Sequence, residues 1–264
     1  MTTVSVPPRF DDVEFLRLDR WLDGCSDDRV VVAAGSNEWS TAGAVAGLRC
    51  LVDSLSRVGA HIEVEMPRAP VAAGRLLASG FCSGLACGPG GTTAASSGWA
   101  GVSLRQIVDA RDAERFSNDV FLALRPTDHR AAVMFATAAG ELTSNSVTHS
   151  GAGNGALAIA EWGMGGHELA VVDRGIGFRG SLVALAQTVT DTDAVAAALG
   201  LGVPRFGRGL GLPDLARHVA GTPGSELILR SGYCGIRLCP GEAAALEELD
   251  HPLRGTFATY RLPR

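Results

Sequence analysis

The sequence changes character abruptly at residues 87–101, CGPGGTTAASSGWAG, where Gly, Ser, Thr and Pro crowd together. This composition is typical of a linker, because these residues favour turns and open chain over helix or strand. The run divides the chain in two. We therefore expect a small N-terminal domain at residues 1–86 and a larger C-terminal domain at residues 102–264.

The N-terminal part reads as alternating strands and helices. A short apolar run at 29–35 and an alternating run at 61–67 are typical of strands. An amphipathic pattern at 42–59 predicts a helix that ends at a glycine, and a second helix is expected at 69–81. Strand–helix–strand–helix order predicts an α/β domain with a parallel sheet covered by helices.

The C-terminal part begins with two expected helices, at 104–123 and 127–148. The other expected elements are strands at 155–162, 167–173, 225–231, 234–239 and 255–263, a helix at 213–220, and a long Gly- and Ala-rich segment at 175–211. This order predicts a two-layer α/β sandwich with one mixed sheet and helices on one face.

Composition excludes several classes of function. The net charge of −5 gives no electrostatic basis for binding nucleic acid phosphates. No apolar stretch is long enough to span a bilayer, and residues 1–15 lack the features of a secretion signal. We therefore expect a cytoplasmic protein that binds neither nucleic acid nor membrane. All 23 basic residues are Arg, which excludes a Walker-type P-loop, a kinase of the usual eukaryotic type and Schiff-base chemistry, since each needs a Lys.

Polar residues follow one another along the end of the second C-terminal helix. Glu141, Asn145 and His149 are spaced four residues apart, so they fall within one quadrant of a helix. The neighbouring stripe, which includes Leu142 and Ser146, is expected to face the core. A carboxylate, an amide and an imidazole thus follow one another directly beside the expected buried face of this helix.

Four motifs occur in order: ELTSN at 141–145, DRGIG at 173–177, GRGLGL at 207–212 and GTFATYRLP at 255–263. Together they resemble the GHKL ATP-binding fold, which histidine kinases, Hsp90-type chaperones, gyrases and anti-sigma factor kinases share. The resemblance covers roughly residues 104–263 and is nearest to the anti-sigma factor serine kinase type. It implies that the chain binds ATP and Mg²⁺.

The resemblance assigns an adenine site to the second and fourth motifs. Asp173 ends an apolar strand, where its carboxylate can accept a hydrogen bond from the exocyclic amine of adenine. Gly175 and Gly177 let the backbone pass close to the base. Thr256 is expected to help bind adenine. A plain Asp-Gly turn and an ordinary strand threonine are the alternatives for these positions.

The other two motifs are assigned to the phosphates. Arg208, Gly209, Leu210 and Gly211 lead into a helix, and free N–H groups at such a start attract phosphate. The segment before them is expected to form a lid over the nucleotide.

The family's pattern makes Asn145 the Mg²⁺ ligand and Glu141 the general base for the attacking hydroxyl or water. A structural salt bridge is the alternative for Glu141. His149 is expected to stabilise the end of its helix through the macrodipole.

The N-terminal part resembles a STAS domain, the fold of anti-sigma factor antagonists, over about residues 29–85. Those domains carry an Asp-Ser-Ser/Ala-Gly turn whose first Ser is phosphorylated by a partner kinase. The matching turn here is STAG, residues 40–43, so that Thr41 takes the acceptor position and Ser40 replaces the Asp. The alternative is that Thr41 only caps the helix that follows it.

These readings predict a bacterial signalling protein, an ATP·Mg²⁺-dependent serine/threonine kinase of the anti-sigma factor type. Its expected partners are a STAS-type anti-sigma antagonist, a sigma factor or both, and a homodimer is left open. The alternative is a noncatalytic, ATP-gated binding switch. A chaperone or topoisomerase ATPase would need further domains that this sequence lacks.

Overall fold

The computed structural model describes residues 1–22, 25, 27–87, 99–151, 153, 155–163, 166–183, 190–201 and 211–263. The strands are β1 (Thr2–Ser5), β2 (Arg9–Phe10), β3 (Arg29–Ala33), β4 (Trp39–Ser40), β5 (His61–Glu65), β6 (Ala86–Cys87), β7 (Ala100–Ile107), β8 (Ala156–Gly163), β9 (Gly166–Asp173), β10 (Glu226–Leu238) and β11 (Ala245–Leu262). The helices are α1 (Asp12–Leu22), α2 (Ala42–Arg57), α3 (Pro70–Ala78), α4 (Ala110–Leu124), α5 (His129–His149), α6 (Gly177–Val183), α7 (Asp191–Ala198) and α8 (Gly211–Gly221).

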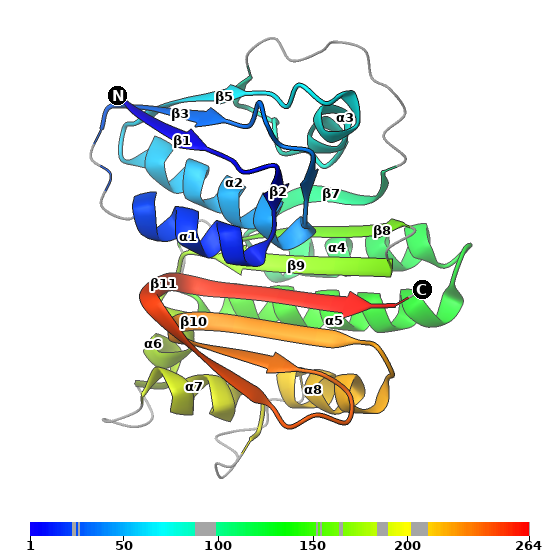
Figure 1. Ribbon diagram of the computed structural model, residues 1–264. Helices are drawn as coiled ribbons and strands as arrows, with labels where there is room; N and C mark the ends of the chain where they lie inside the picture. Colours follow the sequence, from blue (N-terminus) through cyan, green and yellow to red (C-terminus); the bar gives the residue numbers. More distant parts are fainter. Residues whose placement is uncertain are drawn as a thin grey trace.

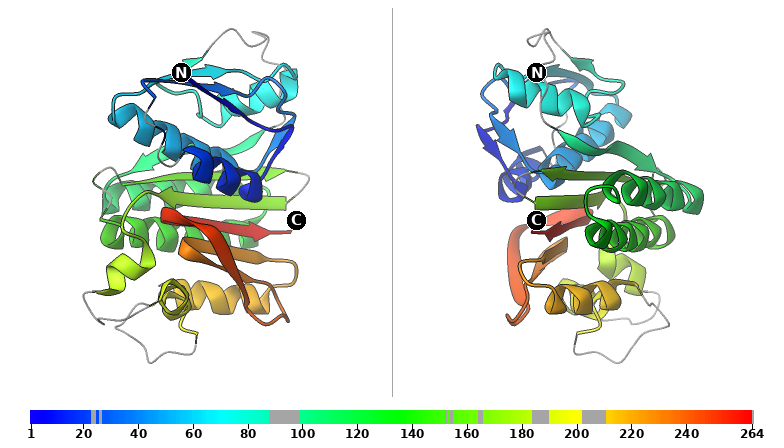
Figure 2. Two further views of the ribbon diagram at one scale, coloured as in Figure 1. Left: turned by 60° about the vertical axis from the view of Figure 1, so that its left-hand side comes forward. Right: turned by 90° about the vertical axis from the view of Figure 1, so that its right-hand side faces the viewer.

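The chain has an α/β fold built on two main sheets (Figure 1), which confirms the predicted fold class. A four-stranded sheet has the order β1-β3-β5-β6 and a five-stranded sheet the order β10-β11-β9-β8-β7, while β2 and β4 form a separate short pair. Helices α4 and α5 cover one face of the five-stranded sheet, and α1 and α2 cover the other (Figure 2). Among the described residues, no helix combines the length and apolarity needed to cross a membrane.

The four-stranded sheet is parallel throughout, as the alternation of strands and helices predicted. A strand can return in the same direction only after a crossover, and helices α1, α2 and α3 supply the crossovers between β1, β3, β5 and β6. The apolar run Val30–Val32 lies at the centre of this sheet and is buried.

The five-stranded sheet is antiparallel at every pair, so the prediction of a mixed sheet was wrong. The reason lies in the connections. Between β7 and β8 the chain runs out along α4 and back along α5, so β8 starts at the end where β7 stopped. The pairs β8–β9 and β10–β11 then form antiparallel neighbours that are also consecutive in the chain. After α6, α7 and α8, strand β10 runs in the same direction as β9, but β11 lies between the two, so no neighbouring strands are parallel.

Several local expectations need correction. The helix expected from Leu104 is a strand up to Ile107, and α4 starts only after Asp109, whose side chain accepts a hydrogen bond from the Asp112 N–H at 2.8 Å. The segment at 175–211 contains the helices α6 and α7, and Thr190 starts α7 with a capping box. Strands β1 and β2 and helix α1 were not predicted at all.

The ends of the expected linker lie in strands. Cys87 belongs to β6, and Ala100 and Gly101 belong to β7, whereas residues 88–98 lie outside the described part of the chain. The part before these residues, 1–87, is called the N-terminal unit below.

The N-terminal unit and the five-stranded sheet share one hydrophobic core. Buried residues of α2, such as Leu48 and Leu51, pack in the same cluster as Ile159 of β8, Val172 of β9 and Phe257 of β11. Phe15 of α1 stacks on Phe257, with ring centroids 5.4 Å apart. A second cluster lies on the other face of the five-stranded sheet, beneath α4 and α5. The central strands are therefore covered on both faces.

Two glycines let α2 approach this close. A Cβ atom on Gly43 would lie 2.7 Å from Cγ2 of Thr259 and 2.9 Å from Cζ of Phe257. A Cβ atom on Gly47 would lie 2.7 Å from the ring of Phe15. All three distances are shorter than carbon atoms tolerate, so only glycine fits at these two positions.

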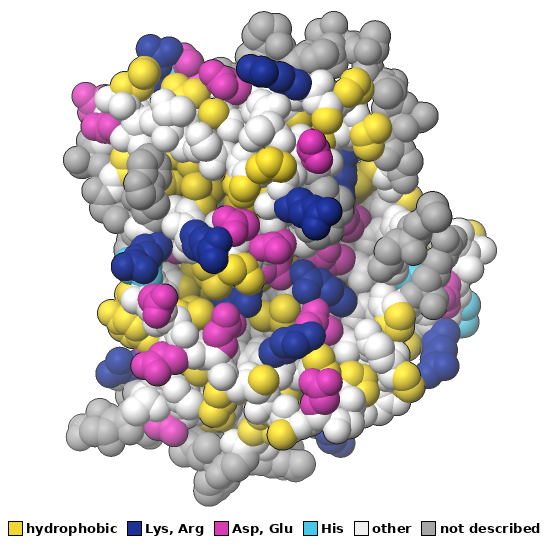
Figure 3. Space-filling model, in the orientation of Figure 1, with side chains coloured by type: hydrophobic (Ala, Val, Ile, Leu, Met, Phe, Trp, Pro, Cys, Tyr) yellow, Lys and Arg dark blue, Asp and Glu magenta, His cyan; other side chains and the backbone are white. Residues whose placement is uncertain are grey.

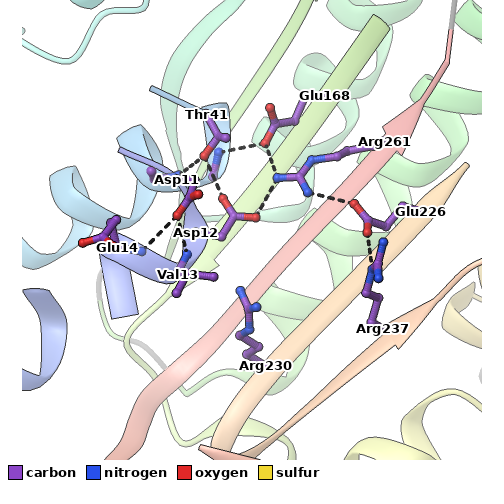
Figure 4. Close-up of polar contacts among 12 residues, drawn as sticks. Asp11, Asp12, Val13, Glu14, Thr41, Glu168, Glu226, Arg230, Arg237 and Arg261 are labelled. Atoms are coloured by element: carbon purple, nitrogen blue, oxygen red, sulfur yellow. Dashed lines mark hydrogen bonds and ion pairs between the residues drawn. The ribbon is translucent and has the colours of Figure 1, made fainter. Parts of the chain in front are cut away.

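A charged cluster lies beside this core, where α1 meets the sheet (Figures 3 and 4). Arg261 of β11 donates to Asp12 of α1 at 2.7 Å, to Glu168 of β9 at 3.2 Å and to Glu226 of β10 at 2.8 Å. Glu168 also accepts from the Gly43 N–H at the start of α2, at 3.3 Å. Burial raises the pKa of Glu168 to about 7, against the opposing effect of Arg261.

We predict that Gly47→Ala destabilises the protein, although alanine is the better helix former by roughly 1 kcal/mol. The added methyl group overlaps the Phe15 ring, and overpacking of this kind costs about 1–3 kcal/mol. Gly140→Ala in α5 is the matched control, because its new Cβ would lie 3.5 Å from Oγ of Ser117, an ordinary contact. Urea denaturation of both variants tests this. A Gly47→Ala protein as stable as wild type would contradict the packing described for α2.

Candidate functional site

A cavity of about 950 Å³ opens on the face of the five-stranded sheet that is turned away from the N-terminal unit. Its wall comes from the second half of α5, the end of β9, the helices α6, α7 and α8, and the hairpin of β10 and β11. Five of the residues singled out in the sequence line it: Asn145, Asp173, Gly177, Gly211 and Thr256. His149 lines it as well.

Asp173 is the most unusual residue of the wall, because it is a buried carboxylate, only 2% exposed. It ends β9 and lies opposite Thr256 in the pairing with β11. Its Oδ1 accepts from the Gly175 N–H at 2.8 Å. The hydroxyl of Ser146 and both the N–H and the hydroxyl of Thr256 also donate to this carboxylate.

Burial raises the pKa of Asp173 to about 6, from an ordinary value of 3.8. The hydrogen bonds from Gly175, Ser146 and Thr256 lower it again but do not outweigh burial. An ionised carboxylate in such a place destabilises the fold, and shifted groups of this kind cluster at functional sites.

The glycines of DRGIG are required by close packing. A side chain on Gly175 would overlap the carbonyl of Ser150 at the end of α5, and the Ile176 N–H donates to that same carbonyl at 2.6 Å. Gly177 has φ of +67°, and a side chain there would meet the hydroxyl of Ser231. The turn after Asp173 is thereby fixed against α5 on one side and β10 on the other.

Ser146 was missed by the sequence reasoning, which placed it in the stripe that faces the core. It is buried, at 9% exposed, but it lines the cavity and donates to Asp173. The signal was present, because a hydroxyl within an apolar stripe needs a hydrogen-bonding partner once it is buried.

Glu141 lies one helical turn before Asn145, as predicted, but the two differ in surroundings. Asn145 lines the cavity, whereas Glu141 is not among the described residues of its wall. The carboxylate of Glu141 packs against Gly211, so closely that a Cβ atom on this glycine would overlap it. Glu141 is thus placed at the start of α8, where the helix dipole favours a negative charge.

Four predicted residues remain. Arg208, Gly209 and Leu210 lie outside the described residues. Thr41 lies in the N-terminal unit, on the opposite side of the five-stranded sheet from the cavity, and is buried at 4% exposed. Its hydroxyl accepts from the Ala44 N–H at 3.0 Å and donates to Asp12 at 2.7 Å. The capping role that was the alternative for Thr41 is therefore confirmed.

The polar groups that line the cavity have the chemistry that an adenine nucleotide with magnesium would need. Asp173 offers a buried acceptor for an amine, Asn145 offers an amide oxygen, and Gly211 begins a helix at the cavity wall. In the described part of the chain, no three His, Cys, Asp or Glu side chains gather as a metal site. A Mg²⁺ ion bound here would take Asn145 from the protein, because Mg²⁺ commonly keeps waters and phosphate oxygens as its other ligands.

No family model, curated protein or solved structure matches this chain. A functional assignment therefore depends on the geometry and chemistry of the site itself.

We predict that ionisation of Asp173 makes the protein less stable as pH rises. Its pKa is raised on folding, so its stabilising contribution is complete below pH 3.8 and is lost as pH rises through about 6. At 1.36 kcal/mol per unit, the free energy of unfolding of wild type relative to Asp173→Asn should fall by up to about 3 kcal/mol between pH 4 and 7. Denaturant titrations of both proteins across this range measure the difference.

Asp193→Asn is the control with a pKa shift of the opposite sign. The hydrogen bonds from Thr190 in the capping box lower the pKa of Asp193 below 3.8, so the stability that wild type gains over this variant is lost only as pH falls below 3.8. The difference between wild type and Asp193→Asn should therefore stay nearly flat between pH 4 and 7. A difference between wild type and Asp173→Asn that stays flat with pH would show that Asp173 titrates normally.

Proposed function

We propose that this chain is an ATP·Mg²⁺-binding signalling protein of the GHKL type that acts as a serine/threonine kinase of the anti-sigma factor kind. Its substrates would be STAS-type anti-sigma antagonists, through which it would control a sigma factor. One observation carries the proposal: a buried carboxylate, Asp173, faces a cavity and is held there by Ser146, Gly175 and Thr256. Each of the four sequence motifs contributes at least one described residue to the cavity wall, and this supports the proposal.

Adenine recognition follows from the chemistry of Asp173. An ionised carboxylate is only an acceptor, so it selects a base that offers a donor. Adenine offers an amine at the position where guanine offers a carbonyl. Leu142, Leu212 and Leu229, which line the same cavity, supply apolar surface for the rest of the base.

Phosphoryl transfer would be divided between two residues of α5. Asn145 would hold Mg²⁺, which neutralises the charge of the phosphates when it is bound. Glu141, one turn away, would accept the proton of the attacking hydroxyl. The hydroxyl oxygen would then bond to the γ-phosphorus while the bond between this phosphorus and the bridging β–γ oxygen breaks, so that ADP leaves. The N-terminal unit, with its parallel sheet and the STAG turn before α2, fits a STAS-like domain under the same proposal.

A specific observation also favours the second candidate, a noncatalytic ATP-gated binding switch. The carboxylate of Glu141 packs on Gly211 instead of lining the described cavity. A structural role at the start of α8 would leave the chain with a nucleotide site and without a base.

We predict that ATP and ADP bind and that GTP does not. Asp173→Asn should weaken ATP binding by about 1.5–3 kcal/mol, or roughly 10- to 150-fold, the value of a hydrogen bond to a charged group. Asp119→Asn on α4 makes the same chemical change at an exposed ion pair with Arg105 and should leave affinity unchanged. Calorimetric titrations of the three proteins check this, and equal affinity for GTP would refute the adenine site.

We predict that substitutions of Asn145 and Glu141 in α5 impair different steps, metal-dependent ATP binding and phosphoryl transfer respectively. Asn145→Ala should remove the difference between ATP titrations with Mg²⁺ and with EDTA. Glu141→Ala should leave ATP affinity nearly intact and slow transfer by roughly 10²–10⁴-fold, the usual contribution of a general base. Single-turnover assays with labelled ATP and STAS-type partners measure this transfer.

Transfer by Glu141→Ala at the wild-type rate would exclude Glu141 as the base. If wild type binds ATP but transfers phosphate to no such partner, the switch is the function. An Mg²⁺ effect that persists in Asn145→Ala would exclude Asn145 as the metal ligand.

A further inference from the structure

Two consecutive residues at the end of β9 reach opposite faces of the five-stranded sheet. Asp173 lines the cavity and contacts Ser146 of α5. Arg174, the next residue, forms an ion pair with Asp19 of α1, in the N-terminal unit. The dipeptide therefore connects the proposed nucleotide site with a helix that lies on the far side of the sheet.

The ion pair between Arg174 and Asp19 is buried. The two side chains are 12% and 3% exposed, and the residues are 155 positions apart in the sequence. Cys50 of α2 lies near enough for the charges of Arg174 and Asp173 to act on its thiol. Removing one partner of a buried ion pair is costly, so neutralising Asp19 favours a shift of Arg174 or the entry of water beside it.

A movement of Arg174 would reach Asp173 through the backbone. The Cα atom of Arg174 lies 2.6 Å from the position that a Cβ atom would take on Gly255, so β11 packs directly on the turn. On the other side Gly175 packs against the carbonyl of Ser150. Gly175 also donates to Asp173. A turn packed this tightly transmits a displacement instead of absorbing it.

We propose that Asp19 is a positioning residue for the adenine site, acting through Arg174, so that docking of the N-terminal unit and nucleotide affinity increase together. This inference rests on the proposed function, according to which the cavity binds a nucleotide. Coupling between two sites is reciprocal, so bound nucleotide would also hold α1 more firmly on the sheet.

The test is a double-mutant cycle on the full chain, with ATP binding measured by calorimetry for wild type, Asp19→Asn, Arg174→Gln and the double variant. Asp19→Asn should weaken ATP binding about 5- to 150-fold, the usual range of coupling between sites. In the Arg174→Gln background the same change should have a much smaller effect on ATP affinity, because the proposed coupling runs through Arg174.

Arg75→Gln is the matched control. It removes another partly buried ion pair between the N-terminal unit and the sheet, that of Arg75 on α3 with Glu161 on β8. Glu161 pairs with Glu168 of β9. Glu168 lies five residues before Asp173 on this strand, a separation of about 17 Å at 3.4 Å per residue. ATP affinity should be unchanged in this variant. An equal loss for Arg75→Gln and Asp19→Asn would show general loosening and overturn the proposal.

A second measurement needs no variant. ATP should slow amide hydrogen exchange in α1 of the wild-type protein, and Asp19→Asn should lose this protection. If wild type binds no adenine nucleotide, the proposed function fails. If wild type binds ATP but α1 exchanges at the same rate with and without it, or Asp19→Asn binds ATP as tightly as wild type, only the coupling fails.

Discussion

The packing of α2 against the five-stranded sheet is the contact on which the rest of the structure depends. Gly43 allows this approach, because a Cβ atom there would overlap Thr259 and Phe257 of β11. Gly47 leaves room for Phe15 of α1, which stacks on Phe257. Antiparallel sheets often leave one face to solvent. Here α1 and α2 cover that face, and β8 and β9 accordingly consist of nearly continuous buried runs instead of alternating ones. The sheet thereby becomes a common wall between the N-terminal unit and the cavity.

Local patterns predicted what depends on nearby residues. The apolar run before Asp173 and the four-residue spacing of Glu141, Asn145 and His149 indicated a strand end and a helix face, and the structure has both. The contact of Ser146 with Asp173 and the pair of Arg174 with Asp19 join residues distant in sequence, so no periodicity reveals them. The second half of β7 was mistaken for a helix start, because its burial does not alternate and only its pairing with β8 identifies it as a strand.

The buried carboxylate of Asp173 is better explained by binding than by stability. Burial raises its pKa to about 6, so at neutral pH the folded protein holds an ionised group that would be better solvated in the unfolded chain. Thr256, Ser146 and Gly175 orient this acceptor without fully compensating for burial. Proteins retain such destabilising groups mainly where a ligand uses them. A ligand amine in the cavity that donates a hydrogen bond to this carboxylate would supply the missing stabilisation.

The position of Glu141 separates the two candidate functions in structural terms. A general base must come within hydrogen-bonding distance of the proton it accepts. In this structure its carboxylate packs against Gly211, where it is stabilised by the start of α8. Catalysis by Glu141 therefore requires the first turn of α8 to move away when nucleotide binds, so that the carboxylate can turn into the cavity beside Asn145. A binding switch requires no such movement, because the contact of Glu141 with Gly211 would persist in both states. The start of α8 is thus the place where a kinase and a switch built on this fold would differ.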